Sequence, residues 1–165
     1  MKFIDKFNEI LNEQLSLHEK LLSLSQEKKD VLIDGSLSNL EKIIKQEHKL
    51  IQDVRFLEKD RYAMIQQLAE ALKMDVNKIT VSFLIDIVQE DTTKTRLANL
   101  KSSLEEVVRE LAEVNELNAK LLEQSLEYIQ TTMETITDDP DQEMVYTNPA
   151  KSGVRKSRSV FDAKT

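Results

Sequence analysis

A stretch of roughly forty residues, from Leu97 to Ile136, contains no glycine or proline and repeats its apolar residues at alternating spacings of three and four. This spacing predicts a long α-helix that is buried along one face. At a rise of 1.5 Å per residue the helix would be about 60 Å long. Opposite charges four residues apart predict ion pairs on its exposed faces, namely Glu105 with Arg109 and Glu116 with Lys120.

The apolar face of this helix changes position along its length. At Asn118 the first apolar line turns polar, and a neighbouring line turns apolar instead. We call this second line the C-terminal stripe; it consists of Leu122, Leu126, Ile129, Met133 and Ile136. A helix needs only one apolar face to join a bundle, so the second face predicts a second partner, either within the chain or foreign.

The composition agrees with a helical protein. Of 165 residues, 40% are hydrophobic and 32% are charged, with two glycines, two prolines and no tryptophan. Long helices with polar outer faces have such a composition, whereas sheet proteins need more turn residues. We therefore predict an all-α fold for residues 1–137: an antiparallel bundle or coiled coil of three long helices plus one short helix. Residues 138–165, which hold both prolines and few apolar residues, predict a flexible C-terminal tail.

The expected ends of the first two helices follow from local signals. The first helix is predicted from about Phe3 to Ile33, with Gly35 suited to the position after its end. The second is predicted to begin at Ser36 or Ser38, because Ser38 and Glu41 have the spacing of a capping box. The short link makes these helices antiparallel neighbours.

A short helix is predicted between the second helix and the last one. The apolar cluster from Val81 to Val88 follows two candidate caps, Asp75 and Thr80. A buried strand would also fit this run, but no partner strand is expected elsewhere in the chain.

Polar residues interrupt the apolar lines of the predicted helices. Two interpretations stay open for Glu47 and Arg61: their stems lie along the bundle edge, or their charged groups contact a partner helix. Two interpretations also stay open for the asparagines of the last helix, which could set the register of the bundle or meet a partner. The interruptions are Gln14, Lys28, Glu47, Arg61, Asn115 and Asn118.

Catalytic and metal-binding patterns are not found in this sequence. His18 and His48 lack the neighbours of a zinc or di-iron motif, and no glycine-rich phosphate loop or nucleophile elbow occurs. We therefore predict no enzyme activity, no metal and no cofactor. The net charge of −7 argues against nucleic acid as a partner. The chain has no cysteine, no signal-peptide pattern and no apolar run of membrane-spanning length, so we expect a cytoplasmic protein.

Several segments together resemble the FlgN-type flagellar export chaperones. The segments Q-E-H-K-L and F-L-E-K-D-R resemble the second helix of that family, and V-N-E-L-N-A-K-L-L-E-Q-S-L-E-Y-I resembles its last helix. The ending, with V-Y-T-N, a glycine and F-D-A-K, is similar to the tail of the family. Order and length also agree, so the resemblance covers nearly the whole chain.

The resemblance implies a cytoplasmic chaperone for export through the flagellar type III system. Its clients would be hook–filament junction proteins of the FlgK and FlgL type, bound through their C-terminal helical regions. Because the apolar face changes at Asn118, we expect Asn118 and the C-terminal stripe to bind the client helix. It would deliver them to an export gate of the FlhA type, with a docking tyrosine matched here by Tyr146. Phe161 is a second aromatic side chain of the same polar segment, and we expect it to dock on the gate as well. A homodimer that covers the stripe when no client is bound would be compatible with this function. A protein of another class, a structural coiled-coil adaptor that self-associates through the same stripe, is the alternative.

Overall fold

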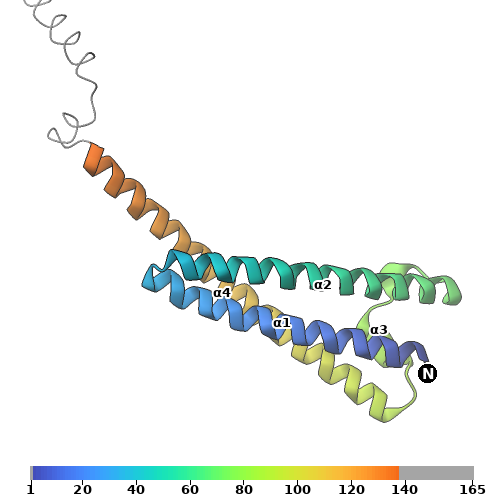
Figure 1. The fold of residues 1–165 in the computed structure, drawn as a ribbon. Coiled ribbons are helices and arrows are strands. Elements are labelled where there is room, and N and C mark those ends of the chain that lie inside the picture. Colours follow the sequence, from blue (N-terminus) through green and yellow to red (C-terminus); the bar gives the residue numbers. More distant parts are fainter. Residues whose placement is uncertain (1, 138–165) are drawn as a thin grey trace, which may run out of the picture. The chain divides into compact units, whose positions relative to one another are not determined.

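A computed structural model describes residues 2–137, and all its regular elements are helices, with no strand in that range. The all-α prediction is therefore confirmed, whereas the predicted tail at 138–165 lies outside the described residues. The chain divides into two compact units within the last helix: unit 1 is Met1–Leu122, and unit 2 begins at Glu123. The elements are α1 (Lys2–Asp34), α2 (Leu37–Leu72), the 3₁₀ helix η1 (Val76–Lys78), α3 (Val81–Ile87) and α4 (Asp91–Thr137) (Figure 1).

The link between α1 and α2 is only two residues long. Gly35 has a φ of +73°, and its N–H donates to the carbonyl of Val31 at 2.9 Å. The helix restarts at once, with Ser36 at the N-cap, so Ser38 lies inside α2. The predicted capping box of Ser38 and Glu41 is therefore wrong. The two helices lie side by side and antiparallel in unit 1 (Figure 1).

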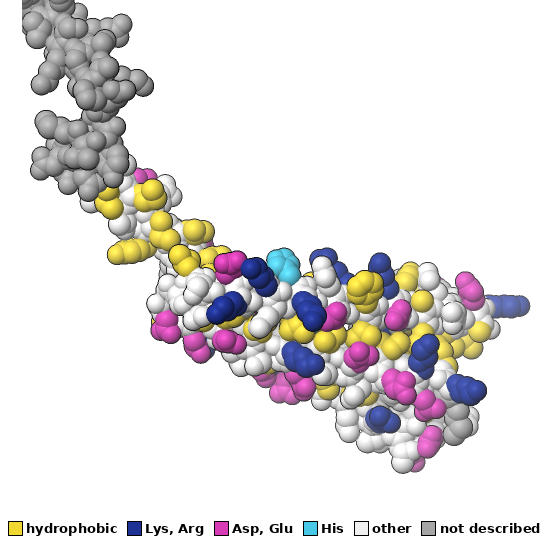
Figure 2. Space-filling model, viewed as in Figure 1, with side chains coloured by type: hydrophobic (Ala, Val, Ile, Leu, Met, Phe, Trp, Pro, Cys, Tyr) yellow, Lys and Arg dark blue, Asp and Glu magenta, His cyan; other side chains and the backbone are white. Residues whose placement is uncertain are grey.

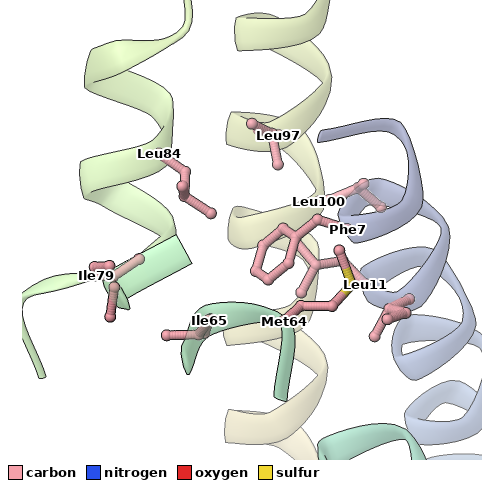
Figure 3. Close-up of a cluster of buried hydrophobic side chains, with 10 residues drawn as sticks. Phe7, Leu11, Met64, Ile65, Ile79, Leu84, Leu97 and Leu100 are labelled. Carbon is pink, nitrogen blue, oxygen red and sulfur yellow. The ribbon is translucent and has the colours of Figure 1, made fainter. Parts of the chain in front are cut away.

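The main hydrophobic core of unit 1 lies near the end of the α1–α2 hairpin where the shorter helices pack. Phe7 of α1, Leu84 of α3 and Leu97 of α4 are fully buried there. The 3₁₀ helix and α3 therefore cover the end of the α1–α2 pair and connect it to α4. Figure 3 labels eight members of the cluster: Phe7, Leu11, Met64, Ile65, Ile79, Leu84, Leu97 and Leu100.

The short elements begin where the sequence predicted. The Asp75 carboxylate accepts from the N–H of Asn77 at 2.9 Å, and the Thr80 hydroxyl accepts from the N–H of Phe83 at 3.1 Å. Both predicted caps are confirmed, because each satisfies a backbone donor at the start of its helix. α3 ends at Ile87, one residue before the predicted end.

The last helix begins earlier than its apolar repeat. α4 starts at Asp91, and the side chain of Glu90 accepts from the hydroxyls of Thr92 and Thr93 just after that start. Because the first turn of α4 is polar, the repeat of apolar residues does not extend to it and could not predict where the helix begins. The predicted pair of Glu116 with Lys120 is confirmed, but Arg109 pairs with Glu113 instead of Glu105. Among residues 2–137, no helix combines the length and the hydropathy that crossing a bilayer requires.

Candidate partner-binding surfaces

In unit 1, α1 forms the floor of a groove and α2 and α4 form its walls. Close backbone approach joins α1 to α2, and no other pair of long helices approaches as closely within the described range. Side-chain hydrogen bonds from Asn115 and Asn118 to Ser25 join α4 to α1. Two hollows, of about 470 and about 390 Å³, lie along this arrangement. Both are lined by all three long helices, and the first also by Thr80, Val81 and Ser82. The two hollows have no lining residue in common but follow one another along the helices, and we call the two together the groove.

The groove follows one face of each helix. Its lining residues recur at spacings of three and four along α1, α2 and α4, which keeps them on a single face of each helix. Its walls carry large apolar side chains that are about two-fifths exposed: Ile44 and Ile51 on α2, and Val108 and Leu122 on α4.

A first polar layer crosses the groove at Gln14, and we call it the Gln14 layer. The Gln14 amide donates to Glu58 Oε2 at 2.7 Å, and Arg61 Nε donates to the same oxygen at 2.9 Å. His18 Nδ1 donates to the carbonyl of Gln14 at 2.7 Å. The bond to Arg61 lowers the pKa of Glu58, although burial opposes the shift, and the same bond raises the pKa of Arg61.

A second polar layer crosses the groove at Ser25, and we call it the Ser25 layer. Lys28 Nζ lies 2.8 Å from both carboxylate oxygens of Glu47, and the Ser25 hydroxyl donates to Asn115 Oδ1 at 3.0 Å. Asn118 Nδ2 donates to the backbone carbonyl of Ser25 at 2.8 Å. Asn118 is only 3% exposed, yet its Oδ1 has no hydrogen-bond partner among the described residues.

Unit 2 presents a different surface, on the last turns of α4. Four members of the C-terminal stripe lie there, each between 47 and 63% exposed: Leu126, Ile129, Met133 and Ile136. Figure 2 shows hydrophobic side chains along this part of the helix. Residues 123–137 include three glutamates and no lysine or arginine. Unit 2 therefore offers a narrow apolar face on an acidic helix.

The structure divides the residues that the sequence assigned to client binding. Asn118 and Leu122 line the groove of unit 1, and the other four lie on unit 2 with their side chains exposed. Asn118 makes its hydrogen bond inside unit 1, as the register interpretation requires. Tyr146 and Phe161, assigned to gate docking, lie outside the described residues.

The structure shows which side chains Glu47 and Arg61 contact, a question that the sequence left open. Each binds an oppositely charged side chain within unit 1, Lys28 and Glu58 respectively, and both line the groove. Sequence reasoning identified these interruptions singly and missed that they combine into a groove. Among residues 2–137, no three histidine or acidic side chains gather as metal ligands would.

Comparison with known proteins now identifies the family. The family model described as FlgN protein matches residues 1–152. A relative from Bacillus subtilis (strain 168), described as uncharacterized protein YvyG, is 31% identical over 150 residues, which cover 90% of each chain. No solved structure gives a significant match. The resemblance seen in the sequence is confirmed, and the chain belongs to the FlgN family of flagellar export chaperones.

Proposed function

We propose that this chain is a cytoplasmic chaperone for hook–filament junction proteins of the FlgK and FlgL type. It binds their C-terminal helical regions, keeps them competent for export, and delivers them to an export gate of the FlhA type. In this proposal residues 1–137 form an antiparallel bundle and residues 138–165 form a separate tail. The observation that carries the proposal is the exposed C-terminal stripe on α4.

The physical reason lies in the client. A subunit that polymerises through amphipathic helices exposes apolar surface before assembly and tends to aggregate. A cytoplasmic partner with an unpaired apolar face at helical spacing covers that surface by helix–helix packing. Leu126, Ile129, Met133 and Ile136 supply such a face, and Leu122 and Asn118 precede them on α4.

Replacing Ile129 and Met133 by aspartate tests the stripe. Each side chain is about half exposed, so completing its burial contributes about half of the ~1.5–3 kcal/mol of a fully buried side chain. Two such losses amount to roughly 1.5–3 kcal/mol, so we expect client affinity to fall at least about tenfold. Isothermal titration of a purified junction protein into each variant measures the change.

A matched control is Thr131→Asp with Thr135→Asp. These positions are exposed, are also four residues apart on α4, and change the charge equally. We expect this control to keep the wild-type affinity, and circular dichroism should show equal helicity for both double variants. Equal affinities of the two double variants would contradict the assignment of the stripe.

The gate would be bound by the C-terminal residues Tyr146 and Phe161. A tyrosine offers a large rigid face and a hydroxyl, which suits an interface anchor. We expect Tyr146→Ala to weaken binding to the export gate by about 2 kcal/mol and to leave client affinity unchanged. Titrations of gate protein into wild type, Tyr146→Ala and a truncation after Asp138 measure this, and equal affinities for all three would contradict a docking role.

The same exposed stripe favours a second candidate, a coiled-coil adaptor that only self-associates. An adaptor would form a stable homo-oligomer that a junction protein does not dissociate. A chaperone would form a complex of one chain with one client, and a client-free homodimer would give way to that complex.

A further inference from the structure

We infer that the groove of unit 1 is a second docking site, for an amphipathic helix of a partner protein whose apolar face carries two hydrogen-bonding side chains eleven residues apart. The site lies on the α1, α2 and α4 faces of unit 1 and does not depend on the exposed stripe of unit 2. The inference therefore goes beyond the proposed client surface and is tested separately from it.

The exposed apolar side chains on the walls of the groove favour a ligand with an apolar face. Ile44, Ile51 and Val108 expose much of their surface toward a hollow that a fourth helix could fill. Helix-in-groove recognition uses apolar anchors at three- and four-residue spacings, which is the spacing of the lining residues here. An amphipathic helix is the ligand whose shape and periodicity match.

The two polar layers on the floor of the groove favour a ligand that carries polar groups at both levels. In the Ser25 layer, the side chains of Lys28 and Glu47 keep 20 and 13% of their surface in water. A purely apolar helix would remove that water without replacing its hydrogen bonds, and such desolvation of an ion pair is unfavourable. The same holds for Arg61 and Glu58 in the Gln14 layer, which are also partly exposed.

The distance between the layers sets the spacing on the ligand. From Gln14 to Ser25 on α1, and from Glu47 to Glu58 on α2, the layers are eleven residues apart, or about 16 Å of helix. Eleven residues make about three turns, so two polar side chains at this spacing lie on the same face of the incoming helix. A ligand helix aligned with the groove therefore meets both layers at once.

Asn118 specifies what the ligand must supply at the Ser25 layer. Asn118 lines the hollow, and its Oδ1 is buried without a partner among the described residues. An acceptor in that position requires a donor such as the side-chain amide of glutamine or asparagine. The ligand side chain at this level is therefore a hydrogen-bond donor.

A second copy of this chain does not meet these requirements. Within residues 2–137, the apolar helical face that a copy would offer is the C-terminal stripe, in which Leu122, Leu126, Ile129, Met133 and Ile136 are all apolar. That face offers nothing to the two polar layers, so the structure favours a foreign helix. Loss of a dimer on changing the groove walls would overturn this choice.

Synthetic peptides test the spacing directly. The probes are three amphipathic peptides of equal length and charge: one with two glutamines eleven residues apart on its leucine face, one with the glutamines seven apart, and one with leucine at both positions. Fluorescence anisotropy with the full chain measures their affinities. We expect the first peptide to bind at least tenfold more tightly than the others, and equal affinities would overturn the proposal.

Variants of the chain locate the site. Ile44→Glu with Ile51→Glu on one wall, or Val108→Glu on the other, should abolish binding of the first peptide. The control Phe56→Glu changes an exposed residue of α2 that lines neither hollow, and it should bind normally. Unchanged binding by both wall variants would place the peptide elsewhere and overturn the proposal.

A specificity switch tests the polar layer itself. Lys28→Met with Glu47→Met makes the Ser25 layer less polar and removes the ion pair as a whole, a type of change that proteins often tolerate. This variant should prefer a peptide with leucine at that level and glutamine at the Gln14 level. Asn118→Leu should lower affinity for the two-glutamine peptide severalfold. An unchanged preference in the Lys28→Met with Glu47→Met variant would overturn the role of the layer.

The stripe variant provides the control. Ile129→Asp with Met133→Asp should leave peptide binding unchanged, which separates this site from the client stripe.

Discussion

Asn118→Leu is predicted to stabilise the folded chain, although it removes a hydrogen bond. The bond from Asn118 Nδ2 to the Ser25 carbonyl is 2.8 Å long and contributes about 0.5–1.5 kcal/mol. The substitution also removes a buried Oδ1 without a partner among the described residues, which costs about 1–3 kcal/mol in the wild type. Leucine has the same branched skeleton of side-chain heavy atoms as asparagine, so we expect a net gain of about 1 kcal/mol.

A neighbouring asparagine provides a comparison of opposite sign. Asn115 Oδ1 accepts the hydroxyl of Ser25, and Ser25 is only 1% exposed. Asn115→Leu removes the acceptor of the buried Ser25 hydroxyl, so we expect the free energy of unfolding to fall by about 1 kcal/mol. Two identical substitutions three residues apart on α4 should therefore shift stability in opposite directions.

Urea unfolding followed by circular dichroism measures both changes. The free energy of unfolding follows from the midpoint and slope, and 1 kcal/mol corresponds to a shift in melting temperature of about 2–4 °C for a chain of this size. A loss of more than 1 kcal/mol in Asn118→Leu would refute the reasoning, because it would mean that Oδ1 is satisfied in the folded protein.

Three further predictions concern the stability of unit 1. Leu97→Ala should lower the free energy of unfolding by about 2–5 kcal/mol, since Leu97 is fully buried in the core; urea unfolding measures this, and a change below 1 kcal/mol would contradict the core assignment. Lys73→Gly should raise the melting temperature, because the residue that ends α2 has a φ of 54°, a conformation that costs a non-glycine residue about 1 kcal/mol. Glu58 has a lowered pKa through its bond to Arg61, so its stabilisation is present above its ordinary pKa of 4.5 and is lost as pH falls through the lowered value. Melting curves of wild type and Glu58→Gln should converge in acid, and a constant difference at every pH would contradict this.

The helices were predictable where an apolar repeat or a local cap defines them. The long helices follow from their three- and four-residue spacing, and Asp75 and Thr80 were identified as caps because their oxygens precede apolar clusters. The start of α4 at Asp91 was not predicted, since its first turns are polar. The capping box at Ser38 failed because Gly35 turns the chain so tightly that Ser36, two residues earlier, takes the N-cap position.

The groove was less accessible to sequence reasoning, although its signal was present. Gln14 and Lys28 interrupt the first helix fourteen residues apart, and Glu47 and Arg61 interrupt the second at the same interval. In an antiparallel pair this matching interval places the interruptions at two common levels. The structure shows Lys28 with Glu47 at one level, and Gln14 with Glu58 beside Arg61 at the other. The position of α4 depends on tertiary packing, which no helical period specifies.

Complex formation with a purified hook–filament junction protein tests the central claim most directly. Size-exclusion chromatography with light scattering gives the mass of the full chain alone, of the junction protein alone, and of their mixture. The proposed function predicts a complex of one chain with one client, which forms even if the chain alone is a dimer. Ile129→Asp with Met133→Asp should prevent this complex at micromolar concentrations. A homo-oligomer whose mass is unchanged by the junction protein would contradict the chaperone function and support the self-associating adaptor.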